Sequence, residues 1–221
     1  EIFTSSIGFV DYQIYKIPAQ NWNIHWESIF GSVEIDSRCI VRAPFHTLEK
    51  SYDYDIVIEP KMSFGTGHHE TTQLMIEEIL DLDCTDKKVV DCGCGTGVLA
   101  IVAKLKGAGY TKAFDIDQWC YENTIENIQR NNVADIQVEC KGIESIKGEI
   151  YVIIIANINR NILLESMEQF TKSLIKSGVL LLSGIYKQDI DIIKNKASEF
   201  QLHFISFHEK NNWVSCKFIK E

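Results

Sequence analysis

The stretch Val89-Val90-Asp91-Cys92-Gly93-Cys94-Gly95-Thr96-Gly97 decides the fold of this chain. It reads as a short buried strand, an acidic residue and a turn with three alternating glycines, and an almost wholly apolar helix over residues 98–106 follows. Glycine takes positive φ at little cost and lets the backbone come close to a ligand. The amino end of a helix adds partial positive charge. A strand, a glycine turn and a helix in this order are typical of a parallel α/β sheet with a ligand at the turn.

Strands and helices alternate from this turn to the end of the chain. Apolar residues at helical spacing and short apolar or β-branched runs follow one another. The predicted helices cover residues 70–80, 98–106, 118–131, 159–174 and 188–200, and the predicted strands cover residues 88–91, a strand ending at 113–115, 136–140, 151–156 and 178–183. Residues 203–209 and 213–219 flank a short polar turn and predict an antiparallel hairpin. We therefore predict an α/β fold with a doubly wound, seven-stranded, Rossmann-like sheet that ends in an antiparallel hairpin.

The composition is that of an ordinary globular protein and excludes several classes. The chain has 221 residues, a net charge of −9 and 45% hydrophobic residues, so a disordered or fibrous chain is not expected. The acidic balance disfavours nucleic acid as the main ligand, and we expect no direct nucleic-acid binding. The longest apolar run, residues 151–158, is too short to cross a membrane. The seven cysteines show neither a disulfide framework nor paired zinc-ligand spacing, so we expect no metal and a cytoplasmic protein.

The first 60 residues differ from the rest. They hold all three prolines, two of the four tryptophans (Trp22 and Trp26) and short alternating strands over residues 31–42. We expect residues 1–60 to form an N-terminal remnant and linker, and residues 61–221 to form the ligand-binding domain.

The spacing of the glycines favours one cofactor. Asp115 lies 22 residues after Gly93, at the end of the next strand, where a carboxylate can accept both hydroxyls of a ribose. Dinucleotides prefer G-x-G-x-x-G, whereas this chain has G-x-G-x-G with Asp91 just before it. The tighter spacing and the extra acid favour a ligand without phosphate and with a cationic amino-acid end, which is S-adenosylmethionine. A purely structural glycine turn is the alternative. The terminal hairpin resembles that of class I methyltransferases.

Four segments, in order, resemble one family. Residues 59–72 contain Phe-Gly-Thr-Gly-His-His-Glu-Thr-Thr, residues 91–97 form the glycine turn, residues 114–117 read Phe-Asp-Ile-Asp, and Asn157-Ile158 follows the fourth strand. Together they are similar to the ribosomal protein L11 methyltransferases, the PrmA family. Two positions depart from that family, which usually has Thr where His68 stands and Pro where Glu70 stands. The family also has an N-terminal domain that docks the substrate, of which residues 2–17 are a candidate remnant.

The resemblance implies the site residues. The residues implied to bind the cofactor are Thr72, Gly93, Asp115 and Asn157, and the glycine turn itself adds Asp91, Gly95 and Gly97. Asn157 is also a candidate catalytic residue, because it lies at the carboxyl end of a central strand. His69 matches the family histidine and is the second candidate; the alternative for His69, and the preferred reading for His68, is that they order the loop. Phe64 either walls the methyl site or belongs to the core, and Trp213 is expected in the core of the hairpin.

The resemblance also implies the reaction: methyl transfer from S-adenosylmethionine to amine nitrogens, both lysine side chains and an α-amine, of a large-subunit ribosomal protein. A lysine with a pKa of about 10.4 must first lose a proton, which costs about 4.6 kcal/mol at pH 7. We expect orientation and desolvation to dominate, without an obligatory general base.

Three other functions stay open as alternatives. A methyltransferase for glutamine or an RNA base usually carries Asn-Pro-Pro-aromatic, whereas Asn157 is followed by Ile-Asn-Arg. A non-catalytic S-adenosylmethionine-binding, ribosome-associated module is the second alternative. A nicotinamide-dependent oxidoreductase is disfavoured by the glycine spacing.

Overall fold

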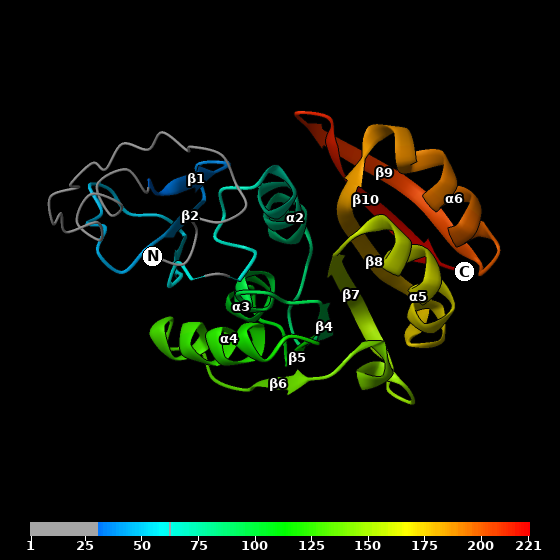
Figure 1. The fold of residues 1–221 in the computed structure, drawn as a ribbon, viewed down its shortest axis with the longest axis horizontal. Coiled ribbons are helices and arrows are strands. Elements are labelled where there is room, and N and C mark those ends of the chain that lie inside the picture. Colours follow the sequence, from blue (N-terminus) through cyan, green and yellow to red (C-terminus); the bar gives the residue numbers. More distant parts are fainter. Residues whose placement is uncertain (1–30, 62) are drawn as a thin grey trace, which may run out of the picture. The chain divides into compact units, whose positions relative to one another are not determined.

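The computed structural model describes residues 31–61 and 63–221 (Figure 1). Residues 32–221 form one unit. The candidate remnant over residues 2–17, together with Trp22 and Trp26, lies outside the described residues.

A seven-stranded sheet organises this unit. Its strand order is β6-β5-β4-β7-β8-β10-β9, and all neighbours are parallel except β10, which runs antiparallel to both β8 and β9. The strands are β4 (Lys88–Cys92), β5 (Tyr110–Asp115), β6 (Ile136–Cys140), β7 (Tyr151–Asn157), β8 (Leu174–Tyr186), β9 (Leu202–Lys210) and β10 (Trp213–Lys220). The predicted doubly wound sheet and its antiparallel hairpin are confirmed.

Helices cover both faces of this sheet (Figure 1). They are α2 (Glu70–Asp81), α3 (Val98–Leu105), α4 (Gln118–Arg130), α5 (Arg160–Lys172) and α6 (Ile190–Ser198). Successive strand residues point to opposite faces, so Val89 and Ile153 join the core under α2 and α3, whereas Val90 and Ile154 join the core under α5 and α6. The near-continuous apolar runs of β4 and β7 are required because both faces of these strands are buried.

The ends of three elements differ from the prediction. Helix α5 begins after Asn159, whose Oδ1 accepts a hydrogen bond from the Ile162 amide at 3.1 Å, and ends at Lys172. β8 is longer than predicted: it starts at Leu174 and continues to Tyr186. α6 starts two residues later than predicted, after the short 3-10 helix η2 (Lys187–Asp189).

A second, three-stranded sheet precedes α2. It contains β1 (Val33–Ile35), β2 (Cys39–Arg42) and β3 (Tyr54–Val57), with β3 parallel to β2. The first two strands fall inside the predicted stretch 31–42, and β3 was not predicted. Buried Ile35, Val41 and Ile56 belong to the same core cluster as α2 and α3. The domain boundary after residue 60 stays a prediction.

Two further observations concern membrane-spanning helices and disulfide bonds. Within the part of the chain that the structure describes, no helix has the combination of length and apolar character that spanning a membrane requires. All seven cysteines are free thiols.

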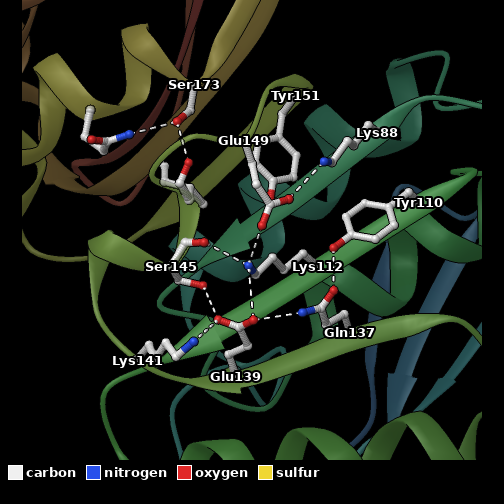
Figure 2. Close-up of polar contacts among 12 residues, drawn as sticks. Lys88, Tyr110, Lys112, Gln137, Glu139, Lys141, Ser145, Glu149, Tyr151 and Ser173 are labelled. Carbon is white, nitrogen blue, oxygen red and sulfur yellow. Dashed lines mark hydrogen bonds and ion pairs between the residues drawn. The ribbon is translucent and has the colours of Figure 1, made fainter.

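A buried lysine on β5 fixes the segment between β6 and β7 (Figure 2). Only 2% of the Lys112 side chain is exposed, and its ammonium donates to the Ser145 carbonyl at 2.8 Å. It also pairs with Glu149 at 2.9 Å and with Glu139 at 3.3 Å. One cation therefore joins both ends of residues 139–149 and the short 3-10 helix η1 (Ile143–Ile146) between them. Because the ion pairs and hydrogen bonds are mutually satisfied, the segment has little freedom to move.

Glu149 should make stability depend on acid. Burial opposes its ionisation, but hydrogen bonds from Lys112, Lys88 and Tyr151 outweigh burial and lower its pKa to about 2. The folded-state pKa lies below the unfolded value, so this contribution is present above about pH 5 and is lost as the pH falls toward 2. We expect Glu149→Gln to unfold at lower urea concentration than the wild type at pH 6, with the difference shrinking toward pH 3. The exposed helical pair of Glu168 makes Glu168→Gln the control, with a smaller effect. A difference for Glu149→Gln that is the same at both pH values would contradict this account.

Candidate active site

A cavity of about 600 Å³ opens at the carboxyl ends of the parallel strands. It lies at the ends of the neighbouring strands β4 and β7. From β4 the chain continues to β5 on one side of this pair, and from β7 it continues to β8 on the other side. Ligands of open α/β sheets bind at such a switch point, and small-molecule sites typically measure about 300–1,000 Å³. The wall is formed by the glycine turn, the end of β5, residues 141–144, the end of β7 and the first turns of α5.

The three glycines of the turn are all required by the protein's own packing. Their φ values are +71° at Gly93, +57° at Gly95 and +78° at Gly97. A Cβ atom would lie 2.3 Å from Ile158 Cγ2 at Gly93, 2.3 Å from the Phe64 carbonyl oxygen at Gly95, and 2.6 Å from Thr124 Cγ2 at Gly97. Gly93 and Gly95 line the cavity, whereas Gly97 caps α3 against Thr124 outside the cavity wall. The packing of the protein itself thus excludes a side chain at all three positions.

Asp115 is held rigidly in the cavity wall. Its Oδ2 accepts from the Gly95 amide at 3.0 Å, and its Oδ1 accepts from the Asp117 amide at 3.0 Å. A carboxylate oxygen can accept more than one hydrogen bond. Both oxygens therefore keep capacity for hydroxyl groups of a ligand, which suits the predicted ribose contact.

Three predicted site residues carry buried oxygen atoms that lack a hydrogen-bond partner among the described residues: Thr72 Oγ1, Asp91 Oδ1 and Asn157 Oδ1. An unpaired buried polar atom costs about 1–3 kcal/mol, so an external partner is expected. Asn157 lines the cavity at the end of β7. Thr72 lies in the first turn of α2 and Asp91 lies beneath the glycine turn, and neither belongs to the cavity wall.

Asp91 is the one strongly perturbed acid near the cavity. Burial raises its pKa to about 7, the Ala100 amide at 3.2 Å opposes this shift, and the charge of Asp115 adds to it. Because this pKa lies close to neutral pH, part of the free protein holds Asp91 in its protonated form at pH 7.

The loop before α2 lies directly on the glycine turn. The Thr96 amide donates to the Phe64 carbonyl at 2.9 Å, and the Thr96 hydroxyl donates to the Gly65 carbonyl at 2.7 Å. The Phe64 side chain is 52% exposed and lines the cavity, so the geometry matches a wall of the site and not the core.

His69 occupies the start of α2 and lies outside the cavity wall. Its Nδ1 accepts from the Thr71 amide at 3.2 Å, which makes it the N-cap. Its ring contacts Phe64 and Trp213, with centroid distances of 5.1 and 4.8 Å. The Thr71 hydroxyl lies 2.8 Å from the same nitrogen, so Nδ1 is engaged at the start of the helix and a neutral ring carries its proton on Nε2. The Nδ1 atom of His68 lies 3.2 Å from the Thr66 hydroxyl oxygen.

Sequence reasoning missed part of the cavity wall. Ile116 follows the end of β5, residues 141–144 follow β6, and Ile162 lies in the first turn of α5. The signal was available, because the first residues after each parallel strand border the same edge of the sheet.

Comparison with known proteins identifies the family. The family model described as Ribosomal protein L11 methyltransferase (PrmA) matches residues 3–221. The ribosomal protein L11 methyltransferase of Bacteroides thetaiotaomicron is 44% identical over 211 residues, which cover 95% of this chain and 75% of that protein. A crystal structure of a ribosomal protein L11 methylase from Lactobacillus delbrueckii subsp. bulgaricus superposes with a TM-score of 0.80 at 24% identity, covering 87% of this chain and 100% of that chain. A methyltransferase from Pyrococcus furiosus superposes with a TM-score of 0.62 at 17% identity, covering 75% and 89% of the two chains.

The sheet order and the cavity at its switch point are those of the class I methyltransferase fold, and the family match makes the chain an S-adenosylmethionine-dependent methyltransferase. Within that class, the chain belongs to the ribosomal protein L11 methyltransferase (PrmA) family. The predicted family, enzyme class and cofactor are thereby confirmed.

Two substitutions separate capping from catalysis at His69. Asn is a strong N-cap residue and has no imidazole, whereas Ala has neither property. We expect His69→Asn to retain both stability and methyl transfer, and His69→Ala to lose about 1 kcal/mol of stability with turnover retained per folded molecule. Urea unfolding and a turnover assay measure the two effects. The catalytic role of His69 stays a prediction, and a stable His69→Asn enzyme without turnover would support it.

Asp91 predicts proton release on cofactor binding. A cation bound over the glycine turn favours the carboxylate and lowers the pKa of Asp91, so we expect cofactor binding at pH 7 to release a fraction of a proton. Calorimetry of S-adenosylhomocysteine binding, in two buffers that differ in ionisation enthalpy, measures this number. Asp91→Asn is the control and should show no dependence on the buffer. Equal heats in both buffers for the wild type would contradict the assignment.

Proposed function

We propose that this enzyme transfers methyl groups from S-adenosylmethionine to amine nitrogens of a large-subunit ribosomal protein, namely lysine side chains and an α-amine. Family membership supports a ribosomal protein as substrate. The observation that supports amine chemistry is Asn157: the residue lines the cavity, and its buried Oδ1 has no hydrogen-bond partner among the described residues. An amine N–H is a donor that such an oxygen can accept.

We propose distinct contributions for the predicted cofactor-binding residues. Asp115 accepts the ribose hydroxyls, and Gly93 and Gly95 present backbone to the ligand. Thr72 offers its unpaired oxygen to the cofactor, whereas Asn157 lines the cavity beside it and offers its oxygen to the amine. Asp91 supplies negative charge from beneath the turn, and Gly97 supports the start of α3. When bound, the cofactor supplies an electrophilic methyl on a positively charged sulfur.

The protein's task is then to present a neutral amine. The Asn157 carboxamide oxygen accepts one N–H of the amine and so directs the nitrogen lone pair toward the methyl. The side chains of Phe64 and Ile158 line the same cavity and give a bound amine apolar surroundings. A water-poor environment disfavours the ammonium form and lowers the pKa of the amine. Orientation of the reacting atoms can supply about 7–11 kcal/mol, which exceeds the deprotonation cost of about 4.6 kcal/mol, so no general base is required.

The absence of an Asn-Pro-Pro-aromatic sequence at Asn157 argues against methylation of glutamine or of an RNA base. No proline follows Asn157, and the next residues are Ile158 and Asn159, of which Asn159 caps α5. The overall charge of −9 favours a basic protein over RNA as the partner.

A transfer assay with labelled S-adenosylmethionine tests the substrate. We expect label in ribosomal protein L11 when unmethylated ribosomal proteins and ribosomal RNA are offered together. Asn157→Ala should reduce turnover at saturating cofactor roughly 10²-fold, because the amine loses its orienting acceptor. Thr124→Ser, which retains the hydroxyl bonded to the Gly95 carbonyl outside the cavity wall, is the control and should stay active. Label in RNA alone, or in no polypeptide, would overturn the proposal.

A further inference from the structure

Ile158 follows Asn157 directly and lies between Gly93, which follows β4, and Gly184 of β8. The ladder between β4 and β7 ends one residue before Gly93, and the ladder between β7 and β8 ends one residue before Gly184. The two glycines therefore flank Ile158 at the point where the chain leaves the sheet.

Both contacts leave no space for a side chain on the glycines. A Cβ atom on Gly93 would lie 2.3 Å from Ile158 Cγ2, and a Cβ atom on Gly184 would lie 2.2 Å from the Ile158 carbonyl oxygen. The φ values of the two glycines are +71° and +83°. Ile158 is thus held by its side chain on one side and by its backbone on the other.

This arrangement bears directly on Asn157. Both residues line the cavity, together with Gly93. The Oδ1 atom of Asn157 has no hydrogen-bond partner among the described residues, so no such bond fixes the direction of that oxygen. The residue on the other side of Ile158, Asn159, is fixed as the N-cap of α5. Of the short segment between β7 and α5, Ile158 is the residue that packs against both flanking strands.

We propose that Ile158 is a positioning residue for methyl transfer: its branched side chain against Gly93 and its backbone against Gly184 fix the direction in which Asn157 presents its carboxamide to the acceptor amine. This inference rests on the role proposed above for Asn157. A β-branched side chain has few allowed χ1 values, which makes it a rigid spacer. Val retains the Cγ2 methyl that meets Gly93, whereas Leu moves the branch one carbon outward and leaves that space empty.

Substitutions at this position test the inference. We expect Ile158→Val to keep kcat within about twofold, and Ile158→Leu to lower kcat about 10- to 100-fold, as a small misplacement of reacting groups does. The Kd for S-adenosylhomocysteine, measured by calorimetry, should stay within about threefold in both variants. Ile192→Leu makes the same chemical change on an exposed part of α6 and should behave as the wild type. Thermal melting confirms that each variant is folded, and Ile158→Ala, which also lacks the Cγ2 methyl, replaces the Leu variant if that one does not fold.

The outcomes separate this inference from the function on which it rests. A fully active Ile158→Leu enzyme beside an impaired Asn157→Ala enzyme would overturn the positioning role alone. Equal losses of kcat and of cofactor affinity in Ile158→Leu would also overturn it, because they would indicate a merely structural residue. A fully active Asn157→Ala enzyme would overturn the role of Asn157 itself.

Discussion

The hydrogen bond from the Gly95 amide to the Asp115 carboxylate, at 3.0 Å, joins the two strand ends on which the site depends. It connects the turn after β4 with the last residue of β5, so that Gly95 and Asp115 lie together in the cavity wall. A hydrogen bond to a charged acceptor is stronger than a neutral one. Since Asp115 also receives the Asp117 amide at 3.0 Å, it both shapes the site and remains able to bind a ligand hydroxyl.

The elements around this bond are packed against the turn from three directions. The loop before α2 covers it through Thr96, the segment after β7 meets it through Ile158, and α4 approaches it through Thr124, whose hydroxyl donates to the Gly95 carbonyl at 3.0 Å. On the far side of the cavity, the ion pairs of Lys112 hold the segment that contains residues 141–144. The cavity is therefore largely preformed, as expected for a small-molecule site.

Much of this architecture was predictable, because the strands of a buried parallel sheet and the helices between them have distinct apolar periods. β6 and the two strands of the hairpin came close to their predicted limits. The short parallel strand β3 was not predictable, since its four residues pair with β2 across an intervening loop and carry no local signal. The burial of Lys112 was not predictable either, because a lysine on a strand is usually exposed. Its partners Glu139, Glu149 and the Ser145 carbonyl lie far from it in the sequence.

Some features of the site could likewise be predicted from the sequence, whereas others depend on the three-dimensional structure. Asp115 and Asn157 were predictable because the ends of parallel strands form the ligand-binding edge. The sequence does not reveal that His69 caps α2, that Gly97 packs against Thr124, or that Ile158 occupies the space beside Gly93. Those facts depend on which segments meet in three dimensions, and a glycine motif looks the same whether a ligand or a neighbouring side chain occupies the missing Cβ.

Calorimetry of S-adenosylhomocysteine binding to the wild type and to Asp115→Ala tests the central claim most directly. The account predicts one binding site per chain in the wild type and a loss of at least about tenfold in affinity in Asp115→Ala, because a fixed carboxylate that accepts two hydroxyls is removed. The same affinity in both proteins, or no heat of binding in a folded wild type that binds NADH tightly, would contradict it.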